Sequence, residues 1–189
     1  MKVKDVMTPH AKTIWLTESL ADAARVMWEN DCGVLPIVKD QKVVGMITDR
    51  DICMATAMRK SNASGISVEE VMTGQVYAVN PEDNIDQALQ VMQQHQVRRL
   101  PVINSEGELE GILSMNDIVL SAKASDGKAG DSIGYGDVVK TYQEISQPSR
   151  TSGSECDCFS VMHQQSRIVI ASATSWSGKM EVRHVGTTK

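Results

Sequence analysis

The octapeptide GMITDRDI (45–52) returns later in the chain as GILSMNDI (111–118). Both copies contain a glycine, an apolar run, a Ser or Thr, and an aspartate three positions after that hydroxyl residue. An apolar β-type run followed by Ser/Thr-x-x-Asp is typical of a strand that leads directly into a capped helix. The stretch therefore predicts a strand-to-helix unit that occurs twice.

The repetition extends to the N-terminal side of this unit. VKDVMT (3–8) returns as VEEVMT (68–73), and GVLPIV (33–38) returns as RRLPVI (98–103). A unit repeated many times is typical of solenoids and propellers, whereas a unit seen twice indicates two small domains. Each would be only marginally stable alone, because a domain of this size buries a small share of its surface, so we expect the two to pair.

Each repeat has the same predicted order of elements. KTIWL (12–16) is strand-like, and after Ser19 the apolar residues recur at helical spacing. LPIV (35–38) and KVVGMIT (42–48) are strands joined by a short polar turn, and a second helix follows. The order is β-α-β-β-α, twice, which predicts an α+β fold.

We divide the chain into four parts. Residues 1–62 and 63–122 are the two domains, and residues 123–146 are a linker with a short helix, YGDVVKTYQEI (135–145), expected to dock on a partner subunit. The Ser/Thr-rich tail, 147–189, is expected to be mobile apart from one strand.

The ordered combination of these features resembles one known family. The β-α-β-β-α order, the opening VMT, the LPVI strand and Gly-apolar-x-Ser/Thr-x-x-Asp are similar to a tandem pair of cystathionine-β-synthase (CBS) domains, over residues 1–122. The resemblance implies that the halves pack about a pseudo-twofold axis, leave two clefts for adenosine-containing ligands and form a homodimer. It also implies a regulatory protein rather than an enzyme.

The motif residues themselves indicate how such a ligand would be held. Asp51 and Asp117 fall in the first turn of a helix, beside free backbone N–H groups that attract phosphate. An ionised aspartate accepts hydrogen bonds and suits vicinal ribose hydroxyls, while Thr48 and Ser114 can donate. The same pattern is also an ordinary helix cap, which needs no ligand.

Basic residues near the motifs are candidates for contacts with phosphate, because guanidinium groups match phosphate oxygens. Arg98 and Arg99 precede the LPVI strand of the second repeat, where the first repeat has no charge. Arg50, within the first motif, either reaches a phosphate or pairs with Asp49 or Asp51. Two solvated charges at a helix end are the alternative for Arg98 and Arg99.

By resemblance, an apolar slot for adenine is built from the first strand of each repeat and from the entrance to the LPIV or LPVI strand. Its candidate residues are Ile14, Pro36, Val79 and Pro101. Ordinary core packing is the alternative reading of each.

Composition excludes several other classes of protein. The net charge of −5 argues against nucleic-acid binding, and no apolar run could span a membrane. The four cysteines do not form a secreted disulfide framework, so we expect a cytoplasmic protein. We expect no metal site, since Cys156, Cys158 and His163 lack a fourth ligand at suitable spacing.

The sequence therefore favours a regulatory module that binds AMP, ADP, ATP or another adenosine compound and changes conformation. A scaffold or dimerisation module without a ligand is the alternative. We expect a homodimer through apolar helical faces such as ALQVM (88–92), and a separate effector protein that the sequence does not identify.

Overall fold

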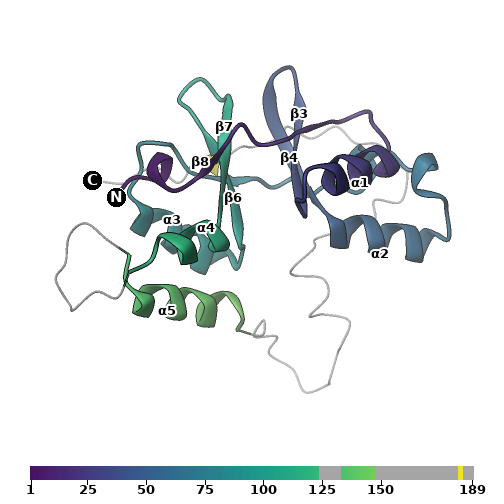
Figure 1. The fold of residues 1–189 in the computed structure, drawn as a ribbon. Coiled ribbons are helices and arrows are strands. Elements are labelled where there is room, and N and C mark those ends of the chain that lie inside the picture. Colours follow the sequence, from purple (N-terminus) through teal and green to yellow (C-terminus); the bar gives the residue numbers. More distant parts are fainter. Residues whose placement is uncertain (124–132, 148–182, 185–189) are drawn as a thin grey trace. The chain divides into compact units, whose positions relative to one another are not determined.

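The structure is a computed structural model that describes residues 1–123, 133–147 and 183–184. The expectations for Cys156, Cys158 and His163, and nearly all those for the tail, lie outside these residues. Figure 1 shows the described elements along the chain. Both repeats have the predicted order β-α-β-β-α, so the α+β fold is confirmed.

The elements of the first repeat are β2 (Ile14–Trp15), α1 (Leu20–Glu29), β3 (Val34–Lys39), β4 (Lys42–Thr48) and α2 (Asp49–Arg59). Those of the second repeat are β5 (Tyr77–Ala78), α3 (Ile85–His95), β6 (Arg99–Ile103), β7 (Leu109–Ser114) and α4 (Met115–Ser121). The remaining elements are β1 (Thr8–Pro9), α5 (Tyr135–Ile145), β8 (Arg183–His184) and the 3-10 turns Val3–Asp5, Ala63–Gly65 and Val68–Glu70.

The structure divides into two compact units that are not identical with the two sequence repeats. The first-repeat unit contains Ala11–Val76, whereas the second-repeat unit contains Met1–His10 together with the described residues from Tyr77 onward. The first segment of the chain therefore belongs to the unit formed by the second repeat. The boundary near residue 62 separates the two sequence repeats, but it is not a boundary between the two compact units.

Each unit is built on a three-stranded sheet. The strand order is β2-β3-β4 in the first-repeat unit and β1-β7-β6 in the second-repeat unit. The hairpins β3–β4 and β6–β7 are antiparallel, as the short polar turns predict, whereas β2 runs parallel to β3. In the two-stranded sheet, β5 runs parallel to β8.

The VMT segments supply an edge to each of these sheets. In the second-repeat unit, Thr8 pairs with Ile112 and Pro9 with Gly111. In the first-repeat unit, Thr73 forms an antiparallel bridge with Met46, the residue that matches Ile112. The VMT segment of each repeat thus lies against the sheet of the other repeat.

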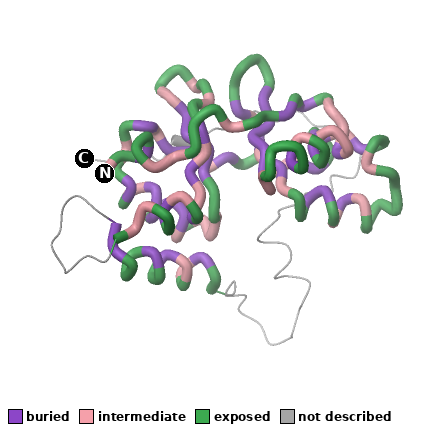
Figure 2. Tube along the Cα trace, viewed as in Figure 1, coloured by how far each residue is buried: buried purple, intermediate pink, exposed green. Residues whose placement is uncertain are grey.

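Each unit has its own apolar core, shown by the buried residues in Figure 2. The first-repeat core includes Ile14, Leu20, Leu35, Ile37 and Ile47. The second-repeat core includes Ala88, Leu89, Met92, Leu100, Leu113 and Ile118. The ALQVM (88–92) face is therefore inside this core, and its assignment as a dimer surface was wrong.

Helix α5 forms where the sequence places it but packs on its own chain. Its Val138 and Ile145 belong to the second-repeat core, where the helix lies against α3 and α4. The buried Thr141 hydroxyl accepts a hydrogen bond from Gln93 Nε2 at 2.7 Å and donates one to the carbonyl of Asp137 at 2.8 Å. The expected docking on a partner subunit is therefore wrong for this face of α5.

Candidate functional site

The first candidate site lies where β4 leads into α2. The backbone N–H and the hydroxyl of Thr48 both donate to Asp51 Oδ2, at 2.9 and 2.6 Å. The backbone N–H of Asp51 donates in return to Thr48 Oγ1 at 3.2 Å, which completes a capping box. Thr48 and Asp51 are therefore both held by the end of the strand and the start of the helix.

The second candidate site repeats this geometry between β7 and α4. The backbone N–H and hydroxyl of Ser114 donate to Asp117 Oδ2 at 2.8 and 2.6 Å, and Asp117 N–H donates to Ser114 Oγ at 3.3 Å. Each capping residue is also the last residue of its strand. Thr48 ends β4 and pairs with Val34, and Ser114 ends β7 and pairs with Arg99. In both repeats one oxygen of the aspartate is fully used by the cap.

The other carboxylate oxygen differs between the repeats. Asp51 is only 3% exposed, and its Oδ1 is the one buried side-chain nitrogen or oxygen without a hydrogen-bond partner in the part of the chain that the structure describes. Asp117 is half-buried, and its Oδ1 accepts from the Thr8 hydroxyl at 3.2 Å. Because an unsatisfied buried acceptor costs free energy, Asp51 Oδ1 has the greater capacity to gain from a ligand donor.

Arg98 lies at the entrance to the second motif, where its carbonyl oxygen accepts from the first N–H of α4, that of Met115, at 3.0 Å. The matching carbonyl in the first repeat is that of Gly33, which accepts from Asp49 N–H at 3.4 Å. Both Arg98 and Arg99 are exposed, and neither side chain forms a hydrogen bond or ion pair with another described residue. They lie at the entrance to β6, and their contact with phosphate stays a prediction.

Arg50 lies in the first turn of α2, and its backbone N–H donates to Asp49 Oδ1 at 2.7 Å. Its exposed side chain also takes part in an interaction. Phosphate contact by Arg50 therefore stays a prediction.

The four residues assigned to an adenine slot are all buried. Ile14 pairs with Ile37 between β2 and β3 and belongs to the first-repeat core. Val79 is the matching core residue of the second repeat, where its N–H donates to Pro101 O at 3.2 Å. Pro36 pairs with Met46 on β4, and a base at these positions would meet strand backbone and core side chains.

Thr8 and Thr73 were not among the candidate residues, although both approach the motifs through the edge pairing of the VMT segments. The signal was present in the sequence, since VMT is part of both repeats. What the pattern does not give is the sheet that each VMT segment joins.

The described residues contain neither a metal-binding cluster nor a membrane-spanning helix. No group of three or more His, Cys, Asp or Glu side chains among them is placed to hold a metal ion. None of their helices has the length and apolar character needed to cross a membrane.

Comparison with known proteins identifies the fold that holds these sites. The family model for the CBS domain matches residues 3–57 and again residues 68–123. The CBS domain-containing protein YhcV of Bacillus subtilis is 33% identical over 124 residues, which are 66% of this chain and 87% of that protein.

Solved structures of CBS-domain proteins also match this chain. The crystal structure of Hypoxic Response Protein I with two coordinated zinc ions matches with a TM-score of 0.58 and 34% identity, over 64% of this chain and 98% of that chain. The CBS domain pair of protein MJ0100, in complex with 5′-methylthioadenosine and S-adenosyl-L-methionine, matches with a TM-score of 0.58 and 28% identity over the same shares. Two family matches, the repeated fold and the paired motifs lead to one conclusion: this chain belongs to the CBS-domain family and carries two CBS domains.

Proposed function

We propose that this protein is a regulatory module that binds an adenosine compound, AMP, ADP or ATP in the first instance, and changes conformation when it does so. The observation that carries the proposal is the buried Asp51 carboxylate, whose Oδ2 is fixed by the cap of α2 while its Oδ1 has no hydrogen-bond partner among the described residues. The complex of the related MJ0100 pair with two adenosine compounds supports the choice of ligand class.

The two sites have different proposed contacts, each for a ligand of its own. At the first site, a ribose hydroxyl donates to Asp51 Oδ1, which removes the cost of an unpaired buried acceptor. At the second site, a ribose hydroxyl donates to Asp117, and phosphate oxygens are held by the guanidinium groups of Arg98 and Arg99. The low exposure of Asp51 means that a ligand reaches this oxygen only when the groups over it move. Binding therefore favours one conformation over another, which is the thermodynamic requirement for a sensor.

A thermal-shift panel tests the proposal, with AMP, ADP, ATP and S-adenosylmethionine as ligands and GTP as the control. A ligand present at 100 times its dissociation constant adds roughly 2.7 kcal/mol to the free energy of unfolding. We expect a shift with at least one adenosine compound and none with GTP. No shift with any of them at several millimolar would refute the proposal.

Asp22→Ala is a matched control for Asp51→Ala. Asp22 occupies the same position in the capping box of α1, where the Ser19 hydroxyl donates to its Oδ2 at 2.6 Å. Both substitutions remove a cap and lower stability by about 1 kcal/mol. Only Asp51→Ala should also abolish the ligand-induced shift at the first site.

A scaffold without a ligand is the second candidate, and the complete capping boxes favour it, because both are formed by protein atoms alone. Under that reading, no adenosine compound would shift the unfolding of the wild type, of Asp51→Ala or of Asp22→Ala. A shift that is seen in the wild type and in Asp22→Ala, and is reduced in Asp51→Ala, therefore distinguishes the candidates.

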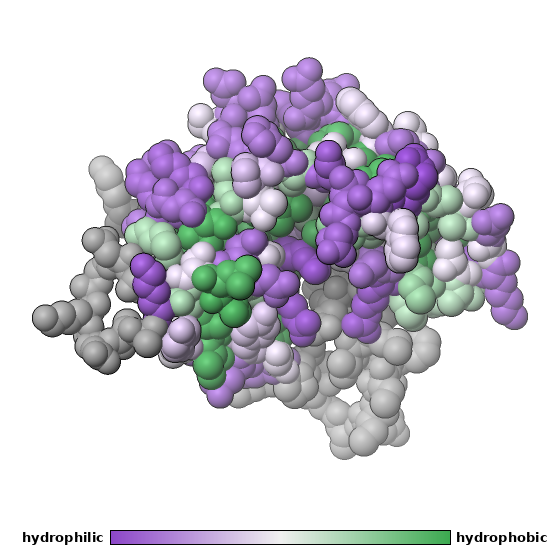
Figure 3. Space-filling view, in the orientation of Figure 1, coloured by the Kyte–Doolittle hydropathy of each residue, from purple (hydrophilic) through white to green (hydrophobic). Residues whose placement is uncertain are grey.

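We also propose a homodimer, through a surface other than the one the sequence indicated. Figure 3 shows hydrophobic side chains gathered over α4 and α5 on the visible face, and the exposed large hydrophobic residues of these helices are Val119, Leu120, Tyr135 and Val139. Leu120 is 85% exposed, and an apolar patch made by several such residues is typical of an interaction surface. A second copy of the chain is the proposed occupant of this surface, because the resemblance to tandem CBS domains implies a homodimer.

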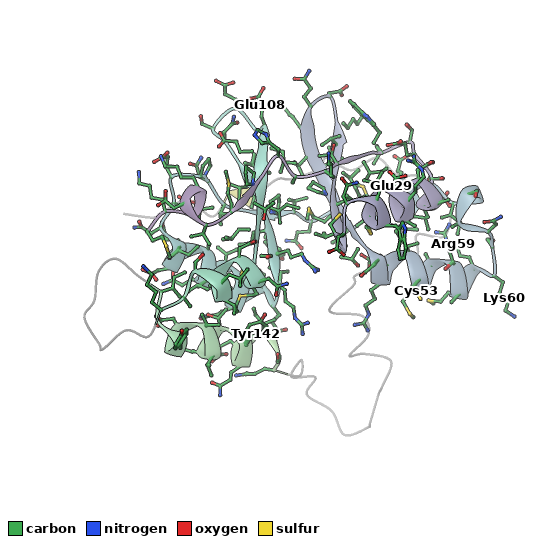
Figure 4. The ribbon with its side chains drawn as sticks, in the orientation of Figure 1. Glu29, Cys53, Arg59, Lys60, Glu108 and Tyr142 are labelled. Carbon is green, nitrogen blue, oxygen red and sulfur yellow. The ribbon has the colours of Figure 1, made fainter. Side chains whose placement is uncertain are left out.

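We place the protein in the cytoplasm. Cys32 and Cys53 are free thiols, and Cys53 projects from α2 as Figure 4 shows. Unpaired exposed thiols persist in a reducing compartment. An effector protein that responds to the ligand-induced change completes the proposal.

A further inference from the structure

Thr8 lies at the second candidate site although it is distant from it in sequence. Its hydroxyl donates to Asp117 Oδ1 at 3.2 Å, across a separation of 109 residues. The edge pairing of Thr8 with Ile112 holds it there, because it places the hydroxyl beside the end of β7 and the start of α4. The position of Thr8 is therefore set by the backbone and does not depend on its own hydroxyl.

Thr73 is the matching residue in the first-repeat unit, and its edge pairing is the same. Its N–H donates to Met46 O at 3.1 Å, and Met46 N–H donates to Thr73 O at 3.4 Å. The hydroxyl of Thr73 nevertheless forms no hydrogen bond to Asp51 Oδ1, which has no partner in the part of the chain that the structure describes. Two aspartates with equal sequence positions and equal caps thus differ in exposure and in whether a VMT threonine occupies the outer oxygen.

A hydrogen bond from a hydroxyl to a carboxylate is charge-assisted, and a ligand hydroxyl must replace it before it can use the same lone pairs. At the second site, part of the gain from a ribose hydroxyl is lost when the bond from Thr8 breaks. At the first site, nothing in the described chain competes for Asp51 Oδ1. The two sites are therefore unequal even for a ligand that fits both.

We propose that Thr8 is an affinity-determining residue, an internal competitor that lowers the affinity of the Asp117 site for ligands with vicinal hydroxyls. The proposal rests on the proposed function, because it assumes that Asp117 receives such a hydroxyl. Its consequence is that the Thr8 hydroxyl lowers the affinity of the Asp117 site below the value that this site would have without it. Thr8→Val, which keeps the shape and β propensity of the residue, should therefore raise the affinity of the Asp117 site.

The test isolates the second site in the Asp51→Ala background and adds Thr8→Val. Isothermal titration with AMP and with ATP should show an affinity about five-fold higher for the double variant than for Asp51→Ala alone, the size expected for one competing hydrogen bond. Thr73→Val in the same background is the matched control and should leave the affinity unchanged. With 2′,3′-dideoxy-ATP, which lacks both hydroxyls, Thr8→Val should have no effect.

An affinity that is equal or lower after Thr8→Val overturns the inference, because Thr8 would then be inert or would itself contact the ligand. That result leaves the proposed function intact if the wild type binds and Asp51→Ala weakens binding. Absence of binding in the wild type and in every variant overturns both. An equal gain with 2′,3′-dideoxy-ATP also rejects the inference, since competition for Asp117 would not be the cause.

Discussion

Thr73 and Met46 exchange two backbone hydrogen bonds, of 3.1 and 3.4 Å, at the residue that follows Gly45 in the first motif. The same crossing occurs in the second-repeat unit, where Thr8 pairs with Ile112 and Pro9 with Gly111. Each motif glycine is therefore a point at which another segment of backbone passes closely over the strand. This contact explains why both motifs begin with glycine.

Gly111→Ala should destabilise the protein more than Gly45→Ala. A Cβ atom at Gly111 would lie 2.4 Å from the carbonyl oxygen of Thr8, whereas one at Gly45 would lie 2.9 Å from the flexible end of Met72 and 3.0 Å from Thr73 O. Overpacking of this kind costs about 1–3 kcal/mol, with Gly111→Ala at or above the upper end. Urea unfolding of the two variants measures the difference.

Gly136→Ala is the control for that comparison. Gly136 is the second residue of α5, and a Cβ atom there meets nothing within 4 Å, so the substitution should leave stability unchanged or raise it slightly. Equal unfolding midpoints for Gly45→Ala and Gly111→Ala would contradict the explanation from close backbone approach.

Thr48→Ala should weaken ligand binding at the first site less than Asp51→Ala does. Thr48 contributes a capping hydroxyl, and its loss costs about 1 kcal/mol of stability but leaves the carboxylate in place. Asp51→Ala removes the acceptor itself. Titration of both variants with the ligand found in the thermal-shift panel gives the ranking, and the reverse order would show that the hydroxyl rather than the carboxylate holds the ligand.

The anchoring of the N-terminal segment should weaken in acid. Lys2 and Lys4 both donate to the Glu82 carboxylate, and these bonds lower its pKa to about 2 from an ordinary value of 4.5. Because the folded-state pKa is below the unfolded one, the contribution to stability is complete above pH 4.5 and is lost as pH falls toward 2. Glu82→Gln should therefore be less stable than the wild type at pH 6, and this difference should shrink by pH 2.

Salt provides the control for this pH dependence. All three side chains are exposed, so 0.5 M NaCl should reduce the difference at pH 6 through screening. Urea midpoints of the wild type and Glu82→Gln at both pH values and both salt concentrations give the answer. A difference that is constant across pH would assign the effect of the substitution to packing.

Leu120→Glu should convert the proposed dimer into a monomer. The side chain is 85% exposed on α4, and a carboxylate there would have to lose its hydration in an interface. Sedimentation at micromolar concentration measures the mass. Trp28→Glu is the control, because Trp28 is 88% exposed on α1 and lies outside the α4–α5 surface.

The sequence was sufficient for the elements and the caps, because both depend on local patterns. Ser19, Thr48 and Ser114 each precede an aspartate by three residues, and each forms the capping box that this spacing predicts. Helix α5 also has the predicted limits, Tyr135–Ile145. The apolar spacing of these helices predicts which face is buried, but it does not identify the element that packs against that face.

The features that sequence missed depend on contacts between distant segments. Strand β1 has only two residues, too few for any periodicity to identify its partner. The ALQVM (88–92) face could pack on the core or on another chain, and only the tertiary structure shows that Ala88 and Met92 are fully buried. The difference between Asp51 and Asp117 arises from the placement of one threonine hydroxyl.

The exchanged VMT segments have a consequence for any chain that contains a single repeat. Such a chain would carry an edge segment suited to the sheet of another copy, as Thr8 suits β7 and Thr73 suits β4. It could complete its sheet only by trading that segment with a second molecule, in the manner of a domain-swapped dimer. The tandem chain resembles such a swapped pair whose two copies are covalently joined. Because the two repeats are linked in one chain, the pairing of each VMT segment with its sheet does not depend on protein concentration.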